Sequence, residues 1–316
     1  MLTTGIVGFK IKGICISARE KEEYLKIRKY INSLSPDTEC FHFSEAIVNP
    51  EILDRCDFIF TVGGDGSVAW LVRTFYDSFG TIDTLKPLVP VTRPSSVGYL
   101  KQLEFGENKF KEGFQRILNG DFNIHNRTIL KVEAFGQQHL AVNEAYAQVN
   151  PHLAKFTVEI ETGEENRFSA ITSTFADGVM ISTSIGSTGW TLSHGGYVNL
   201  NENALQILTL GGIHSSANFI VPRKKVRVTL DLKNTTITDQ ALNAYNEARI
   251  REGLKPDENP RKTLEILYGS RLVLDGKALS FGVSEFVVDP SITIPFVTLR
   301  KHTEIDKVRR LTEIQF

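Results

Sequence analysis

The sequence lacks the features of membrane and secreted proteins. It has no run of about 18 apolar residues, the length that a membrane-spanning helix needs. Its first residues, MLTTGIVGFKIKG, lack the long apolar core of a secretory signal. Only three cysteines are present and none is in C-x-x-C spacing, which favours reduced thiols over disulfides or a zinc site. We therefore expect a soluble, cytoplasmic protein with no membrane partner.

An excess of either charge is also missing. The 316 residues include 36 Lys and Arg against 37 Asp and Glu, a formal net charge of −1. Without a basic field, nucleic acid is not an expected partner. The length suggests one large domain or two ordinary ones, and the 41% hydrophobic content is that of a globular chain.

Several common catalytic motifs are absent. The sequence contains no G-x-x-x-x-G-K-[ST] P-loop, no G-x-G-x-x-G fingerprint, no G-x-S-x-G elbow and no H-E-x-x-H. Its seven histidines are scattered along the chain, which argues against a metal site built from neighbouring residues. These absences disfavour classical hydrolases and ordinary dehydrogenases.

The first third of the chain alternates short apolar strands with amphipathic helices. Strands are expected at 13–17, 57–62 and 88–91, and apolar spacing predicts helices over 24–34, from about Ser67 to Phe79, and over 110–118. Ser17 and Glu20 have the spacing of a capping box. This alternation is typical of a parallel sheet in an α/β domain.

Beyond about residue 122, strand-like segments follow one another, which predicts a mostly β, sandwich-like second domain. We expect domains at 1–121 and 122–298, a C-terminal tail at 299–316 that packs back on the first domain, and a surface excursion at 239–262. The expected strands of the second domain are 128–134, 140–148, 156–161, 168–174, 179–183, 225–232, 264–268 and 271–274.

The stretch TVGGDGSVAW at 61–70 stands at the end of the second expected strand. Gly63, Gly64 and Gly66 allow positive φ and let a ligand approach the backbone, and the following helix presents free N–H groups to an anion. A tight turn alone would explain the glycines. It would not explain Asp65, because a carboxylate in a phosphate cradle is unfavourable unless it binds a metal or accepts a proton.

Two further stretches carry polar groups. Asn143 and Glu144 lie inside the expected strand 140–148, where adjacent side chains point to opposite faces unless a bulge or strand end intervenes. Residues 176–196 hold seven hydroxyl side chains between 182 and 193, together with Trp190. Hydroxyls and free amides suit ribose and phosphate, and Trp190 offers a ring face. A Ser- and Thr-rich turn around a buried tryptophan is the simpler explanation, but it does not account for so many hydroxyls.

In this order and spacing, the three stretches resemble the motifs of the NAD kinase family. The GGDG turn alone is shared with the diacylglycerol and sphingosine kinases, but the combination extends from about residue 57 to 290. The matching segments are GGDG at 63–66, GYL at 98–100, NE at 143–144, DG…ST…GST…GG at 177–196, IHS at 213–215, IVP at 220–222 and LDG at 274–276.

The resemblance implies an α/β domain and a β domain with the active site between them, and Mg²⁺-dependent transfer of a phosphoryl group from ATP to the 2′-hydroxyl of the adenosine ribose of NAD. By position, Asp65 would be the general base. The family usually forms homodimers or homotetramers. The implied ligand residues are Gly63, Gly64, Gly66 and Ser67 for ATP phosphates, and Asn143, Glu144, Lys155, Asp177, Thr188, Gly189, Trp190 and Ser193 for NAD.

The sequence departs from the family at acceptor-side positions. Trp190 replaces a tyrosine, Phe175 replaces a basic residue, and the segments 93–97 and 210–214 differ. Two other functions therefore stay open, namely phosphorylation of another alcohol (a nucleoside, polyol or lipid) and non-catalytic dinucleotide binding. The sequence also leaves open polyphosphate as donor, NADH as acceptor, and which residues hold the metal.

Overall fold

The computed structural model describes residues 9–94, 99–149, 154–163, 167–212, 217–231, 239–261, 263–264 and 269–299. The described residues form two compact units, which divide the chain into residues 1–128 with 293–316 and residues 129–292. The expected boundaries at 122 and 298 differ from this division. The reason is that β6 (Phe122–Thr128) and β19 (Thr293–Leu299) pair with each other and extend the first sheet.

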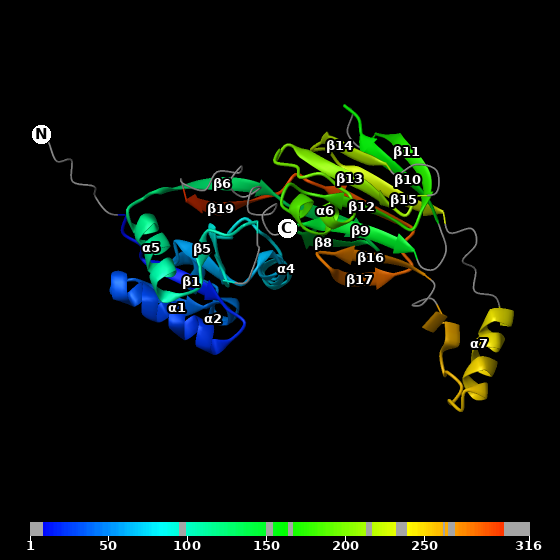
Figure 1. Ribbon diagram of the computed structural model, residues 1–316, viewed down its shortest axis with the longest axis horizontal. Coiled ribbons are helices and arrows are strands. Elements are labelled where there is room, and N and C mark those ends of the chain that lie inside the picture. Colours follow the sequence, from blue (N-terminus) through cyan, green and yellow to red (C-terminus); the bar gives the residue numbers. More distant parts are fainter. Residues whose placement is uncertain are drawn as a thin grey trace, which may run out of the picture. The chain divides into compact units, whose positions relative to one another are not determined.

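The first unit is built on a largely parallel sheet. Only β6, antiparallel to β19, breaks the parallel pattern among the described strands, and Figure 1 shows these two side by side. A short strand, β5 (Leu103–Glu104), pairs with β4. The sheet order is β2 (Glu39–His42), β1 (Gly13–Ser17), β3 (Phe58–Val62), β4 (Leu88–Thr92), β19 and β6.

Helices cover the first sheet as the apolar spacing predicts. All five residues of both β1 and β3 are buried, so both faces of the sheet are covered. One face packs against Tyr24, Ile27 and Ile31 of α1 and the phenylalanines of α5. The helices of this unit are α1 (Lys21–Leu34), α2 (Phe43–Val48), α3 (Glu51–Asp54), α4 (Asp65–Phe79) and α5 (Glu107–Leu118).

The second unit is a sandwich of two antiparallel sheets, which confirms the expected fold class. One sheet has the order β14 (Asn218–Pro222), β13 (Ala204–Leu210), β12 (Gly178–Ser182), β9 (Glu144–Val149), β16 (Ser270–Leu274) and β17 (Lys277–Phe281). The other has the order β11 (Phe168–Ala176), β10 (Ala154–Glu161), β15 (Val226–Asp231), β18 (Glu285–Asp289), β7 (Leu130–Ala134) and β8 (Gln137–Ala141). Buried aliphatic side chains from both sheets form one core.

Three local expectations were wrong. The segment 140–148 is not one strand but two, because the chain turns at residues 142–143. Ser17 does not cap α1, since it belongs to β1 and the N-cap residue is Glu20, whose side chain makes no capping bond. Thr263 and Leu264 are helical rather than extended, while 265–268 lie outside the described residues.

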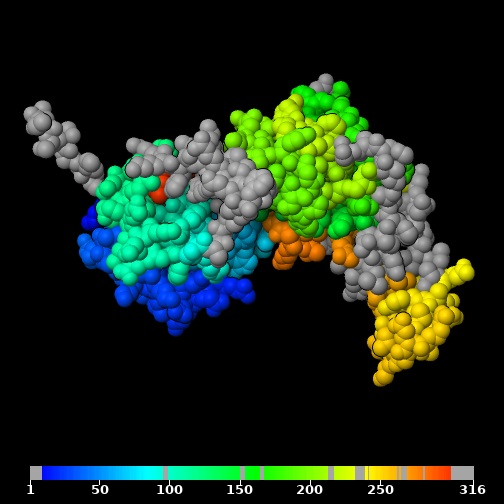
Figure 2. All heavy atoms as spheres, viewed as in Figure 1, coloured from blue at the N-terminus to red at the C-terminus, as the bar shows by residue number. Residues whose placement is uncertain are grey.

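The expected excursion at 239–262 contains α7 (Asp239–Arg251). Its described side chains are exposed or half-buried, and Figure 2 shows its visible side, in yellow, uncovered.

No helix in the described part of the chain is long and apolar enough to cross a membrane. The three cysteines are free, with Cys15 and Cys56 buried.

Candidate functional site

The glycine turn follows β3 as the sequence predicts, and its shape requires glycine at one position. Gly63 has φ +138°, and a Cβ there would lie 2.0 Å from the Ser67 hydroxyl oxygen. Its N–H donates to the Val91 carbonyl at 2.9 Å, which ties the turn to β4. By contrast, a Cβ at Gly66 would meet nothing within 4 Å. The backbone at Gly63 is therefore covered by Ser67, whereas the backbone at Gly66 has room for a ligand.

Asp65 is the first residue of α4, so the helix starts earlier than the expected Ser67. The Asp65 carboxylate accepts the N–H groups of Tyr99 at 3.0 Å and of Leu100 at 3.2 Å. These two residues belong to the GYL segment, whose Gly98 lies outside the described residues. Asp65 thus has a structural function that the sequence did not reveal: it joins the start of α4 to the segment after β4.

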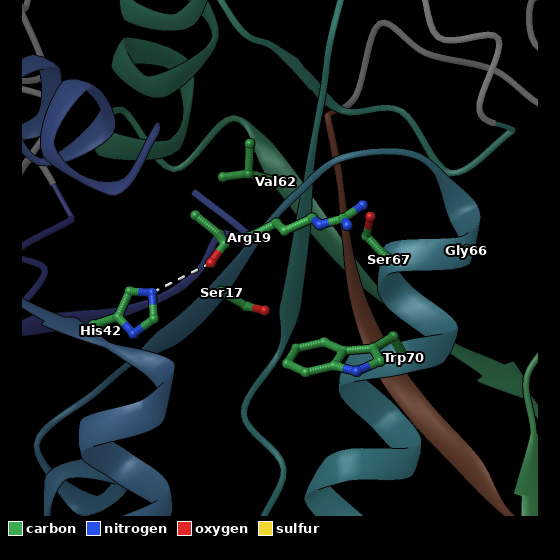
Figure 3. Close-up of a pocket in the computed structure, with 8 residues that line it drawn as sticks. Ser17, Arg19, His42, Val62, Gly66, Ser67 and Trp70 are labelled. Atoms are coloured by element: carbon green, nitrogen blue, oxygen red, sulfur yellow. Dashed lines mark hydrogen bonds between the residues drawn. The ribbon is translucent and has the colours of Figure 1, made fainter. Parts of the chain in front are cut away.

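A cavity of about 570 Å³ opens beside this turn (Figure 3). It lies at the carboxyl ends of β1 and β3, which are neighbours in the sheet, while the chain passes from β1 to β2 on the opposite side. Strand order therefore reverses between β1 and β3, and ligands of open α/β sheets bind at such a switch point. The residues that line the cavity are Ser17, Ala18, Arg19, His42, Val62, Gly66, Ser67 and Trp70.

Of the lining residues, only Gly66 and Ser67 were candidates from the sequence; Arg19, Trp70 and His42 are among those that were not. Figure 3 shows Arg19 extending across the cavity toward Ser67. Its side chain is 88% exposed, and its Nε lies 3.9 Å from Oε1 of Glu20. Trp70 is half exposed and packs edge-on against Phe43. His42 Nδ1 accepts the Ser44 N–H, which leaves Nε2 to donate to the Ala18 carbonyl at 3.3 Å. The cavity therefore combines a cation, a hydroxyl, an open backbone and an aromatic face.

In the second unit, the turn at 142–143 places Asn143 and Glu144 at a strand end. Thr183 clamps this turn: its N–H donates to the Asn143 carbonyl at 2.9 Å and its hydroxyl to the Val142 carbonyl at 2.8 Å. The rule that adjacent strand residues face opposite ways does not hold for this pair, since β9 begins only at Glu144. Asn143 Oδ1 is buried and has no hydrogen-bond partner among the described groups.

Glu144 is a buried carboxyl group beside a second acid. Its side chain is only 4% exposed. Burial, and then the negative charge of Asp275, raise the pKa of Glu144 from 4.5 to about 8. At neutral pH Glu144 is therefore mainly protonated, and it can donate a hydrogen bond as well as accept one.

The hydroxyl-rich segment after β12 uses its hydroxyls to hold its own shape. It contains a short 3₁₀ helix, η1 (Gly186–Thr188), and α6 (Trp190–Ser193). All seven hydroxyls have acceptors within the unit, for example the carbonyl of Ile185 for Thr188 and that of Gly189 for Ser193. The Ser- and Thr-rich turn of the simpler explanation thus accounts for the number of hydroxyls, but Trp190 is 38% exposed and not buried as that explanation expected. The number of hydroxyls is therefore by itself no sign of a ligand.

Gly186 and Trp190 fix this segment on the 143–144 turn and on β9. A Cβ at Gly186 would lie 2.1 Å from the Asn143 carbonyl oxygen, so only glycine permits the contact. The Trp190 ring packs against Tyr146 with centroids 4.7 Å apart, and its Nε1–H donates to His194 at 3.1 Å. The structure therefore brings Asn143 and Glu144 close to the segment holding the candidates Thr188, Gly189, Trp190 and Ser193.

Asp177 and Lys155 lie elsewhere in this unit. Asp177 precedes β12, whereas Glu144 pairs with Ser182 at the other end of that strand, about 16 Å away at 3.3 Å per residue. Lys155 is exposed on β10 of the second sheet, opposite Phe175, which replaces the basic residue of the family. Within the unit, these two residues do not join the 143–144 turn.

A dedicated metal cage is not found in the described part of the chain, where no three His, Cys, Asp or Glu side chains lie close enough to hold an ion. Mg²⁺ in kinases is usually bound by one or two carboxylates together with substrate phosphates. Asp65 supplies one carboxylate beside the glycine turn, and its oxygens already accept two amides. This donor set fits an ion carried mainly by the phosphates of ATP.

Comparison with known proteins was made by sequence and by structure. No protein-family model matches the chain. The NAD kinase of Shewanella halifaxensis is 32% identical over 154 residues, which cover 47% of this chain and 45% of that protein. The NAD kinase of Chlorobium luteolum is 29% identical over 166 residues, covering 50% and 52%. The chain thus spans about half the length of the curated relatives it matches.

Among the solved structures that share its fold are two kinases. An NAD kinase from Archaeoglobus fulgidus in complex with ATP has a TM-score of 0.63 at 17% identity, covering 94% of this chain and 99% of that one. Yeast NADH kinase complexed with NADH has a TM-score of 0.67 at 18% identity, covering 97% and 88%. The resemblance that the motifs indicated is therefore confirmed: the chain has the fold of NAD kinases and is similar to them in sequence over about half its length.

Proposed function

We propose that the protein is an NAD kinase, which transfers the γ-phosphoryl group of ATP to the 2′-hydroxyl of the adenosine ribose of NAD. The observation that carries this proposal is the aspartate-bearing glycine turn beside an open cavity, on the fold of NAD kinases. The named relatives and the ATP and NADH complexes of the structural neighbours support it.

In the proposed reaction, the Asp65 carboxylate accepts the proton of the 2′-hydroxyl. The ribose oxygen forms a bond to the γ-phosphorus, the bond from that phosphorus to the bridging oxygen breaks, and ADP leaves with the electron pair. A carboxylate has about four lone-pair positions, so acceptance of the Tyr99 and Leu100 amides is compatible with a base. A bound Mg²⁺ ion would neutralise phosphate charge.

The donor nucleotide would occupy the cavity of Figure 3. The open backbone at Gly66, the Ser67 hydroxyl and the start of α4 suit phosphate oxygens, and Arg19 supplies a positive charge. The exposed face of Trp70 suits a purine ring. Gly63 and Gly64 would act by shaping the turn.

On the acceptor side, Asn143 and Glu144 would bind the dinucleotide, with Thr188, Gly189, Trp190 and Ser193 lining its site. The unpartnered Asn143 Oδ1 suits a ribose hydroxyl donor. Asp177 and Lys155 would contribute only where the bound dinucleotide extends beyond the 143–144 turn. We further propose a homodimer or homotetramer.

The test is a direct assay of NADP formation. The purified protein is incubated with MgATP and with NAD, NADH, a nucleoside, a polyol or a diacylglycerol, and the ADP and phosphorylated products are measured. NADP formed in proportion to ADP is the expected result. ADP formed only with another alcohol would support the second enzyme function, and binding of NAD without ADP formation would support the non-catalytic one.

A further inference from the structure

The turn between β16 and β17 holds an aspartate that does more than form a turn. Asp275 and Gly276 have φ of 49° and 74°, the left-handed pair of a two-residue hairpin, for which Asp-Gly is a favoured sequence. The backbone conformation of these two residues is sufficient for the hairpin turn, so the turn does not need the Asp275 side chain. The Asp275 carboxylate instead accepts three consecutive N–H groups of a distant segment, those of Val142 at 3.0 Å, Asn143 at 2.7 Å and Glu144 at 3.3 Å.

We propose that Asp275 is a positioning residue for the dinucleotide site, which acts by holding the backbone of the 142–144 turn. The inference rests on the proposed function in that the ligand is taken to be NAD. It adds a residue that the motif comparison left without a role, and it assigns that residue to the backbone of the turn, not to the ligand.

The hydrogen bonds show why the turn depends on Asp275. The Asn143 amide is held by Asp275 and the Asn143 carbonyl by Thr183, so the residue is fixed on both sides. The Asp275 N–H also donates to the Glu144 carbonyl at 3.0 Å, which makes the contact reciprocal. A charged acceptor forms stronger hydrogen bonds to amides than a neutral one. Loss of the carboxylate would free the peptide groups that place the Asn143 and Glu144 side chains.

The charge of Asp275 has a second effect. It faces Glu144, and together with burial it disfavours ionisation of that carboxyl. Among the described groups, Tyr146, two residues along β9, also interacts with the charge of Glu144, and Arg271 on β16 acts on Tyr146. Asp275 therefore also helps to keep Glu144 in the form that can donate a hydrogen bond to an acceptor oxygen of the ligand.

The test compares Asp275→Asn and Asp275→Ala with the wild type in steady-state kinetics and in NAD binding by calorimetry. The expected result is a KM and Kd for NAD about tenfold higher in Asp275→Ala, from the loss of charge-assisted bonds, with the KM for ATP unchanged. Asp275→Asn keeps one acceptor oxygen, so its KM and Kd for NAD are expected to lie between those of the wild type and of Asp275→Ala. It should also shift the pH midpoint of NAD binding downward, because the charge facing Glu144 is gone.

Asp289→Asn is the matched control, since Asp289 also accepts a backbone N–H, that of Ser291, but lies on β18 in the other sheet. If the KM for ATP rose as much as the KM for NAD in the Asp275 variants, and the pH midpoint of NAD binding did not move, the substitutions would have caused general structural damage. That result would overturn the inference. Unchanged NAD binding in both Asp275 variants would overturn it as well. A wild type that neither binds nor phosphorylates NAD would instead overturn the proposed function, and this inference with it.

Discussion

The two units each contain an aspartate whose carboxylate accepts backbone amides, and the comparison between them is instructive. Asp65 accepts two amides and stands at the start of a helix, beside a cavity of about 570 Å³. Asp275 accepts three amides and faces the buried Glu144. The hydrogen-bond pattern is nearly the same, so the surroundings decide the role. Asp65 belongs to the turn whose Gly66 and Ser67 line the cavity, while Asp275 holds the backbone of the 142–144 turn.

The loops around these residues differ in the same way. The glycine turn leaves backbone open at Gly66, whereas the hydroxyl-rich segment at 182–193 satisfies its own hydroxyls. An open backbone can change partners when a ligand arrives. A segment that is already hydrogen-bonded gives shape instead, and here it covers β9 through the Trp190–Tyr146 contact.

Asp65→Asn gives the sharpest test of the role assigned to the first aspartate. An amide cannot accept a proton at neutral pH, so kcat should fall by about 10²- to 10⁴-fold, the usual contribution of a general base. The Kd for NAD and for ATP should change by less than about threefold if binding is separate from proton transfer. Asp77→Asn, on the exposed side of α4, is the control and should be fully active. A normal kcat in Asp65→Asn would rule out the base.

Glu144→Gln tests whether the second unit really buries a protonated acid. Because the pKa of Glu144 is about 8 in the folded chain against 4.5 ordinarily, the native state holds a proton that the unfolded chain has released between these values. The free energy of unfolding should therefore fall as pH rises from 4.5 to 8, by at most about 1.4 kcal/mol per pH unit.

In Glu144→Gln this contribution should disappear, which urea unfolding at several pH values would measure. The variant Glu285→Gln, at an exposed position of β18, serves as the control and should keep the wild-type slope. If the dependence of the unfolding free energy on pH were the same in Glu144→Gln and the wild type, Glu144 would be ionised at neutral pH. The contrast between the surroundings of Asp65 and those of Asp275 would then be lost.

Gly63→Ala and Gly66→Ala distinguish the closed from the open side of the glycine turn. An alanine at 63 would have φ +138° and a Cβ 2.0 Å from the Ser67 oxygen, so unfolding free energy should drop by about 1–3 kcal/mol. At 66 the Cβ meets nothing, and alanine favours a helix, so stability should be unchanged or higher by up to about 1 kcal/mol. Thermal unfolding would show the difference, and equal losses would contradict the geometry.

Arg19→Ala and Trp70→Ala test the cavity itself and carry the smallest expected effects. An exposed charge and one stacked ring each contribute about 1 kcal/mol, so the KM for ATP should rise about fivefold in each variant while the KM for NAD stays constant. Trp70→Phe should recover most of the loss because it keeps a ring face. A rise in the KM for NAD alone would place the acceptor, not the donor, in this cavity.

Much of the first unit could be predicted from local patterns. Tyr24, Ile27 and Ile31 recur at helical spacing and are buried on one face of α1, and the glycine turn was visible because three glycines follow an apolar strand. The pairing of β6 with β19 was not predictable, since these strands are far apart in the sequence and β6 has mostly exposed residues. The strands β13, β14 and β18 were also missed.

The candidate site was found only in part. Asp65 could be recognised because a carboxylate is unfavourable among phosphate-binding groups unless it binds a metal or accepts a proton. Asn143 and Glu144 could be recognised as a polar pair in an apolar segment. Arg19 and Trp70 were missed because nothing local distinguishes them; their importance arises when β1 and β3 become neighbours and leave a cavity between their ends. Asp275 was noticed as part of a motif, but its role depends on a contact 132 residues away along the chain, with Asn143.

The sequence by itself determined part of the local geometry: where most strands and helices of the first unit form, where glycine is required, and which residue types are available for phosphoryl transfer. Those features follow from backbone sterics and side-chain period, which act over a few residues. Only the tertiary structure decided what each carboxyl group does. Burial and the charge of Asp275 raise the pKa of Glu144, and hydrogen bonds make Asp275 a support for the 142–144 turn. Asp65 comes to lie next to Gly66 and Ser67, which line a cavity. These differences arise because solvation and long-range contacts exist only once the chain has folded.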